Sequence, residues 1–176
     1  MSRMDLGLVD RITAGTIGEP GQRTFFLQAR SGGELVTIVV EKQQVQLLSA
    51  SILELLADLE LETGVGPSDD ELRLEEPIDP MFRAGKLSIG YDDGRELFVL
   101  EIEEFIPEVE GEEALTAPEG EPDNVQLAAT REQMFALSRY AAAVVERGRP
   151  TCQFCGNPID TGGHACPAMN GHSKRN

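Results

Sequence analysis

The two halves of the chain repeat one order of sequence patterns, in which three strand-like segments precede a helix-like segment. In the first half the strand-like segments are 11–18, 23–30 and 35–40. Hydrophobic residues then recur every three or four positions from Val45 to Leu59, which places them on one face of a helix. This helix is expected to end before the turn-forming residues 64–67.

The second half follows the same order after a polar, acidic connector at 67–80. Its strand-like segments are 82–91, 95–105 and 125–129. The sequence Asp92-Asp93-Gly94 predicts a tight hairpin turn between the first two of them. Thr130 and Gln133 have the spacing of a capping box, so a second helix is expected to begin there and to end at Gly148.

The two halves also match residue by residue. The matches are 16–18 with 88–90, Arg23 with Arg95, Phe26 with Phe98, Val36 with Val125, Lys42 with Arg131, Gln44 with Gln133, Leu48 with Leu137 and Ser49 with Ser138. We therefore predict an α+β fold made of a tandem βββα repeat, with an antiparallel sheet and two helices on one face. The expected parts are a first unit at 1–66, the connector, a second unit at 81–149 with an acidic loop at 106–123, and a tail at 150–176. The sequence leaves open whether the two units share one sheet.

Net charge limits the classes of partner. The chain has 31 acidic and 15 basic residues, a net charge of −16, whereas nucleic-acid binding needs clustered Lys and Arg. The element order is similar to that of Whirly-type single-strand binders, but such proteins need stacking aromatics, and here only 5% of residues are aromatic. Single-strand nucleic-acid binding is therefore the least favoured function. From Arg147 to Asn176 the sign reverses, with four basic residues and one acid, a pattern typical of an interaction tail.

Targeting signals are missing from the sequence. No apolar stretch approaches the roughly 18 residues of a membrane span, and residues 1–10 lack the basic and apolar regions of a secretory signal. We expect a cytoplasmic protein that does not contact a membrane.

All three cysteines and both histidines lie between Cys152 and His172. Cys152 and Cys155 form a C-x2-C pair followed by glycine, which lets two thiolates reach one ion. A structural zinc site takes four thiolate or imidazole ligands in a tetrahedron. The other two ligands are then either His164 with Cys166, in C-x2-C-x8-H-x-C, or Cys166 with His172, in C-x2-C-x10-C-x5-H. The tail contains a single acid and no H-E-x-x-H motif, so we predict a structural Zn²⁺ that stabilises a segment too short to form a core.

Other polar residues offer weaker candidates. A polar cluster with binding character surrounds Arg23 and Lys42, and its other members are Gln22, Gln43 and Gln44. Two serines, Ser49 and Ser138, have no histidine outside the tail, so a Ser-His-Asp nucleophile is not expected. The acidic run that includes Glu101, Glu103 and Glu104 has the ligand type for a hard cation such as Mg²⁺, although acidic runs are usually solvated.

Several motifs resemble an actinobacterial family of conserved hypothetical proteins that share a domain of unknown function. The motifs are AGTIGEPGQRTFFLQAR at 14–30, EKQQ at 41–44, and the tail GRPTCQFCGNPID…GHACP…NGH. The resemblance implies Cys152, Cys155, His164 and Cys166 as metal ligands and leaves His172 as the alternative fourth ligand. It implies no activity.

The leading hypothesis is a non-catalytic, zinc-binding interaction or regulatory protein, with no catalytic residue assigned. The acidic loop and the basic tail would contact a protein partner that the sequence does not identify. The alternative is a small-ligand binder or enzyme that uses the polar cluster near Arg23 and Lys42. The oligomeric state is not predicted.

Overall fold

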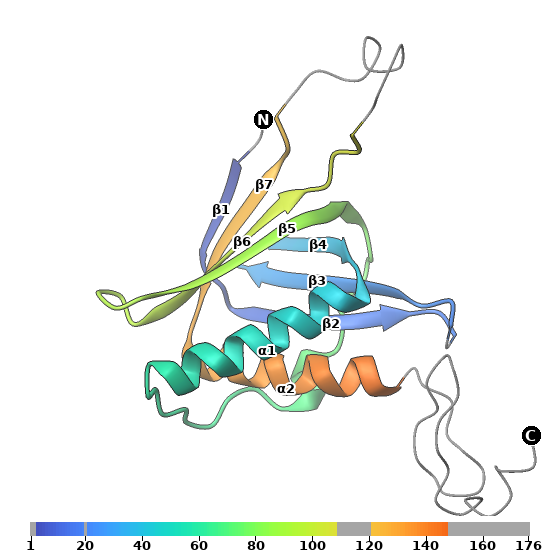
Figure 1. The fold of residues 1–176 in the computed structure, drawn as a ribbon. Coiled ribbons are helices and arrows are strands. Elements are labelled where there is room, and N and C mark those ends of the chain that lie inside the picture. The colour runs from blue at the N-terminus through green and yellow to red at the C-terminus, as the bar shows by residue number, and fades with distance from the viewer. Residues whose placement is uncertain (1–2, 20, 109–120, 148–176) are drawn as a thin grey trace, which may run out of the picture.

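The computed structural model describes residues 3–19, 21–108 and 121–147. Within them, seven strands and two α-helices form one unit of the α+β class, as predicted (Figure 1). The elements are β1 (Arg3–Leu8), β2 (Arg11–Ile17), β3 (Thr24–Ser31), β4 (Glu34–Val40), α1 (Lys42–Asp58), the short 3-10 helix η1 (Asp69–Leu72), β5 (Pro80–Asp92), β6 (Leu97–Glu104), β7 (Asn124–Ala129) and α2 (Arg131–Arg147). The predicted strands and helices all form, with ends within a few residues of those expected.

The strands lie in one mixed sheet, in the order β1-β7-β6-β5-β4-β3-β2. The prediction of an antiparallel sheet is wrong at two places, because β1 pairs with β7 and β4 pairs with β5 in parallel. The chain between β4 and β5 contains α1 and the connector. This long crossover brings the chain back to the side at which β4 began, and β5 can therefore run parallel to β4. Both halves therefore belong to the same sheet.

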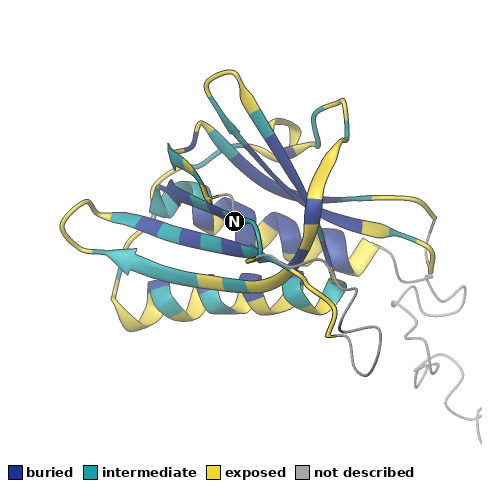
Figure 2. Ribbon diagram, turned by 90° about the horizontal axis from the view of Figure 1, so that it is seen from above, coloured by how far each residue is buried: buried dark blue, intermediate teal, exposed yellow. Residues whose placement is uncertain are grey.

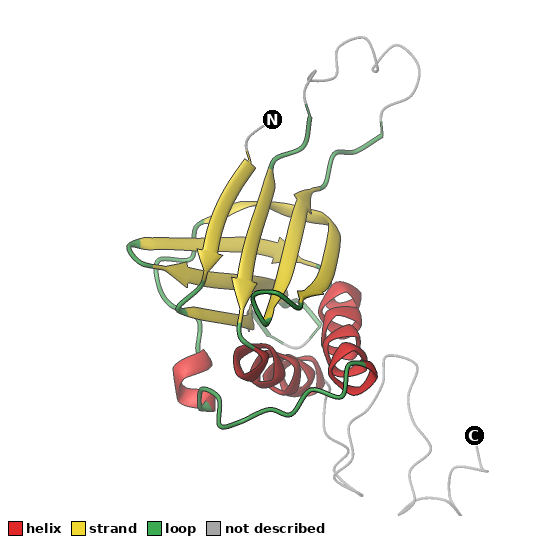
Figure 3. Cartoon of the chain, turned by 90° about the vertical axis from the view of Figure 1, so that its left-hand side faces the viewer, coloured by secondary structure: helices red, strands yellow, loops and turns green. Residues whose placement is uncertain are grey.

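Strand β1 was not predicted from the sequence. Val9 and Asp10 join this strand to β2, and they form hydrogen bonds to strands near opposite ends of the sheet order. The backbone N–H of Val9 donates to the carbonyl of Ala128 in β7 at 2.9 Å, and that of Asp10 donates to the carbonyl of Arg30 in β3 at 2.8 Å. The sheet is consequently strongly curled, as Figure 3 shows.

The turn between β5 and β6 is longer than predicted. Asp92 pairs with Leu97, so the four residues 93–96 form the connection instead of a tight Asp-Gly turn. Glu96 has a positive φ of 56°, and the side chain of Asp92 accepts a hydrogen bond from the N–H of Arg95 at 3.2 Å.

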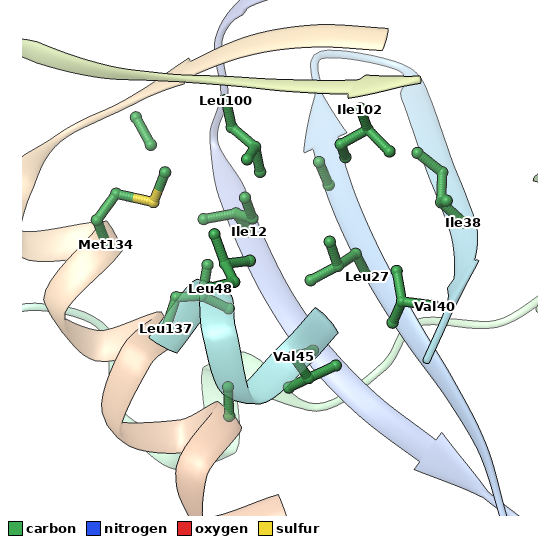
Figure 4. Close-up of a cluster of buried hydrophobic side chains, with 14 of the residues drawn as sticks. Ile12, Leu27, Ile38, Val40, Val45, Leu48, Leu100, Ile102, Met134 and Leu137 are labelled. Carbon is green, nitrogen blue, oxygen red and sulfur yellow. The ribbon is translucent and has the colours of Figure 1, made fainter. Parts of the chain in front are cut away.

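The core lies between the concave face of the sheet and the two helices (Figure 4). Strand residues such as Ile12 and Leu100 meet helix residues such as Leu48 and Leu137, and all four are at most 5% exposed. Figure 2 shows buried positions along the central parts of the strands and on both helices. Burial of this apolar area is the main stabilising contribution to the fold.

The two helices begin in the same way and lie side by side (Figure 1). Each has 17 residues. The N–H of Glu41 donates to the side-chain oxygen of Gln44 at 2.7 Å, and that of Thr130 donates to Gln133 at 2.8 Å. Each is the bond from the N-cap backbone to the side chain three residues later that a capping box contains.

When the two halves are aligned by their strand pairing, the matched residues differ from those of the sequence alignment. Phe25 pairs with Val40, and Phe98 pairs with Ala129, so the inward-facing counterpart of Phe98 is Phe25 and not the predicted Phe26. By the same criterion, the counterpart of Gln28 is Glu101. Thr13 pairs with Gln28 and Ser88 with Glu101, which matches Thr13 with Ser88 and therefore Gly15 with Gly90.

Candidate functional site

The predicted metal ligands Cys152, Cys155, His164, Cys166 and His172 lie outside the described residues. Within residues 3–19, 21–108 and 121–147, no group of three or more His, Cys, Asp or Glu is placed to hold a metal ion.

The acidic residues of β6 accordingly do not converge on a cation site. The carboxylate of Glu101 accepts a hydrogen bond from the side-chain amide of Asn124 at 2.8 Å, and that of Glu104 accepts one from the N–H of Asp123 at 3.0 Å. Both carboxylates thus bind β7 or the segment that leads into it.

Arg23, the centre of the predicted polar cluster, is bound to the end of α2. Its guanidinium donates to the carbonyls of Val144 at 2.9 Å and Val145 at 3.3 Å, and it lies 4.8 Å above the ring of Phe25. Burial lowers the pKa of this guanidinium. The last carbonyls of a helix have no partner within the helix, so Arg23 supplies one.

Gln44 also has a structural role. Besides accepting the bond from the N-cap of α1, its side-chain amide donates to the carbonyls of Ala84 at 3.2 Å and Gly85 at 3.3 Å, and so ties α1 to β5. Lys42 is half-buried in the first turn of α1, and Gln43 is exposed. Arg23 and Gln44 are therefore engaged with backbone carbonyls, and the predicted cluster does not form a site in which its side chains converge on a ligand.

A partly buried polar network around Gln28 was not predicted from the sequence. Gln28 is 1% exposed on β3. Its amide nitrogen donates to the hydroxyl of Thr37 at 3.0 Å and to the carbonyl of Glu75 at 2.9 Å, while its oxygen accepts from the N–H of Glu75 at 2.7 Å. Gln28 thus binds both the N–H and the carbonyl of a single connector residue, Glu75. We call this residue set the connector clamp, and its members are Arg11, Thr13, Gln28, Arg30, Thr37 and Glu75.

The clamp also contains ion pairs and a hydroxyl contact. The carboxylate of Glu75 lies 3.3 Å from the guanidinium of Arg11 and 2.8 Å from that of Arg30. Burial lowers the pKa of Arg11, and the charge of Glu75 opposes this effect. The hydroxyl of Thr13 donates to the carbonyl of Leu72.

The connector is thus docked on the sheet, although it is polar and acidic. Leu72 is 1% exposed. Leu74 covers Gly15 so closely that a Cβ on this glycine would lie 2.5 Å from the Cγ of Leu74. Two sequence features could have indicated this docking. One is the pair of leucines, Leu72 and Leu74, within an acidic run, and the other is the polar residues at alternate positions of the strands that the connector covers.

Two serines that the sequence analysis considered are bound to helix backbone. The hydroxyl of Ser49 donates to the carbonyl of Ser138 at 2.7 Å, where α1 and α2 meet. The hydroxyl of Ser138 donates to the carbonyl of Phe135 at 2.7 Å.

A groove of about 300 Å³ lies between α1 and β5. We call it the α1/β5 groove, and its lining residues are Gln44, Leu47, Leu48, Ser51, Gly85, Lys86, Leu87, Ser88 and Ile89. Leu47 is 68% exposed on its rim. The groove is largely apolar, which suits an apolar side chain or peptide better than a charged metabolite.

The described part of the chain is thus an α+β platform, with a curled mixed sheet, a docked connector and an open apolar groove. A family model described as "Protein of unknown function (DUF3090)" matches residues 4–166, and the chain belongs to this family. No curated protein and no solved structure shows significant similarity to it. In the described part of the chain, no helix is long and apolar enough to cross a membrane.

Proposed function

We propose that this protein is a non-catalytic, zinc-binding interaction or regulatory protein of the cytoplasm. The platform formed by residues 3–147 would carry a zinc-stapled C-terminal segment that contacts a protein partner. One observation carries the proposal: every cysteine and histidine lies at 152–172, whereas Arg23 and Gln44, two of the polar side chains first considered as a second site, are bound to backbone carbonyls.

The proposed zinc ligands are Cys152, Cys155, His164 and Cys166. The family match ends at residue 166 and so includes these four residues but not His172, which supports His164 as the fourth ligand. Cytosolic thiols remain reduced, and three cysteines in one short segment are then available as thiolates for a metal.

We also infer that the platform is a tandem βββα repeat. Support comes from the helices, which have equal lengths, equivalent caps and a contact at the matched serines Ser49 and Ser138. Each half also pairs its three strands in chain order, as β2-β3-β4 and as β5-β6-β7.

The two other functions have less support. A ligand site at Arg23 would have to break the bonds that this side chain makes to α2. Nucleic-acid binding on the open sheet face would bring phosphates against Glu101 and Glu103, in a chain with a net charge of −16.

Affinity capture from native cytosol tests the proposal. The wild-type chain, the double variant Cys152→Ser/Cys155→Ser and the control His172→Asn would be compared at equal loading, with zinc content measured for each. We expect a stoichiometric partner with the wild type and with His172→Asn, and its loss with the double variant. The same proteins captured by all three chains, or a partner with none of them, would contradict the proposal.

A further inference from the structure

The connector occupies a groove between α2 and β2. It passes the first turns of α2, where the N–H of Gly64 donates to the carboxylate of Glu132 at 3.3 Å. A Cβ on Gly66 would be 3.4 Å from the Cβ of Ala136. Further along, Leu72 binds the hydroxyl of Thr13 on β2 through its carbonyl. The connector therefore fills the space along one helix and one strand.

The matching groove on the other half is the α1/β5 groove, because α1 packs against β5 as α2 packs against β2. Helix alignment matches Ala136 with Leu47. Ala136 is 2% exposed beneath the connector, whereas Leu47 is 68% exposed.

The sheet face opposite the helices, to which Gly15 and Gly90 belong, shows the same contrast. Strand pairing matches Gly15 with Gly90. A Cβ on Gly15 would collide with Leu74, whereas a Cβ on Gly90 would meet nothing within 4 Å. One of two matching seats is thus filled by the connector, and among the described residues nothing fills the other.

We propose that the second seat, the α1/β5 groove and the adjoining sheet face, binds the C-terminal segment 149–176 of the same chain. The connector is the segment that follows α1, and it fills the α2/β2 groove. The C-terminal segment follows α2 in the same way. The proposal concerns the groove and does not depend on a bound metal.

The end of α2 is well placed for the C-terminal segment to reach the α1/β5 groove. Its last turn is bound to Arg23, which directly precedes β3. The first residues of β3 pair with the end of β4, and α1 follows β4 directly, so α2 ends near the start of α1. Gln44, in the first turn of α1, lines the groove.

The C-terminal segment is also long enough. From the end of α1 at Asp58 to Leu72, the connector uses about half as many residues as the chain contains from 149 to 176. The segment includes the large apolar residues Phe154 and Ile159, which suit a groove lined by Leu47 and Leu87.

Charge favours this occupant over an acidic one. The connector is acidic, and its clamp contains Arg11 and Arg30. In the second seat the strand counterparts of Gln28 and Arg30 are Glu101 and Glu103, and that of Arg11 is Lys86, which lines the groove. The C-terminal segment has the basic residues Arg149, Lys174 and Arg175 and a single acid, Asp160. The proposed occupant is thus reversed in charge relative to the connector, and the seat has two carboxylates and one ammonium where the clamp has two guanidiniums and an amide.

Photo-crosslinking in the full-length chain tests the proposal. The reporter variant is Leu47→p-benzoylphenylalanine, and the control is Leu53→p-benzoylphenylalanine, because Leu53 is also exposed on α1, at 45%, but does not line the groove. We expect position 47 to crosslink within the monomer to peptides from 149–176, several-fold more than position 53. Crosslinks to a second copy, to another protein, or equally from both positions would overturn the proposal.

Hydrogen–deuterium exchange gives a second readout in the intact chain. Leu47→Asp is expected to raise amide exchange within 149–176 by about tenfold, with Leu53→Asp indistinguishable from the wild type. Equal exchange of this segment in all three chains would overturn the proposal, whatever the metal content.

Discussion

Gln28 is a single side chain that fixes the position of a segment 47 residues away. At 1% exposure, its amide bonds have no competing water, and removing one partner leaves the others buried and unpaired. We expect Gln28→Leu, which nearly keeps the side-chain volume, to lower the free energy of unfolding by about 2–3 kcal/mol. Chemical denaturation measures this change.

A matched control for this variant is Gln46→Leu, because Gln46 is exposed on α1. Its effect should stay within about 0.5 kcal/mol, as for most surface substitutions. A small effect of Gln28→Leu, equal to that of the control, would show that the clamp does not hold the connector.

Arg23 is expected to stabilise the last turn of α2. Arg23→Met keeps an apolar stem but removes the charge, the two bonds to α2 and the contact with Phe25. We expect a loss of about 1 kcal/mol in stability and faster amide exchange at 144–147. Arg139→Met, an exposed position on the same helix, is the control. Unchanged exchange in the last turn of α2 would contradict this role.

The roles of individual side chains were the feature least predictable from the sequence. Arg23 and Lys42 were grouped with nearby glutamines as a candidate binding cluster because all of these side chains are polar. The actual partners of Arg23 are carbonyls more than one hundred positions away, at Val144 and Val145. A local pattern contains no information about a contact of this range.

At the scale of elements, two matched glycines distinguish the seat that the connector fills from the open seat. Gly15→Ala would place a Cβ 2.5 Å from Leu74, which requires the connector to shift, and we expect a loss of about 1–3 kcal/mol. Gly90→Ala meets open space and is expected to change stability by less than about 1 kcal/mol. Thermal unfolding of the two variants gives the comparison, and equal losses would contradict the docking of the connector against β2.

The elements themselves were largely predictable. Helical spacing from Val45 and the capping pair Thr130 and Gln133 identified both helices, because these signals are local. The parallel pairings β1–β7 and β4–β5 were not predicted, because strand patterns do not specify the neighbouring strand. The edge strand β1 was also not predicted, although Arg3, Met4, Asp5 and Leu6 alternate between polar and apolar residues, because this local signal covers only four positions before Gly7.

At the scale of the molecule, the curled sheet and its helices form a platform on which most candidate polar groups are committed to structural contacts. The cysteines and histidines of the chain all lie at 152–172, and they were apparent from the sequence because they are confined to one short segment. Membership of the family extends through Cys166.

Native mass spectrometry of the full-length chain tests the central claim most directly. Wild-type protein, purified without chelator, is expected to have the mass of the chain plus one zinc ion, and Cys152→Ser is expected to lose that ion. His164→Asn should weaken zinc binding and His172→Asn should not. A wild-type chain with the mass of the apoprotein after incubation with zinc, and three freely alkylated thiols, would contradict the account.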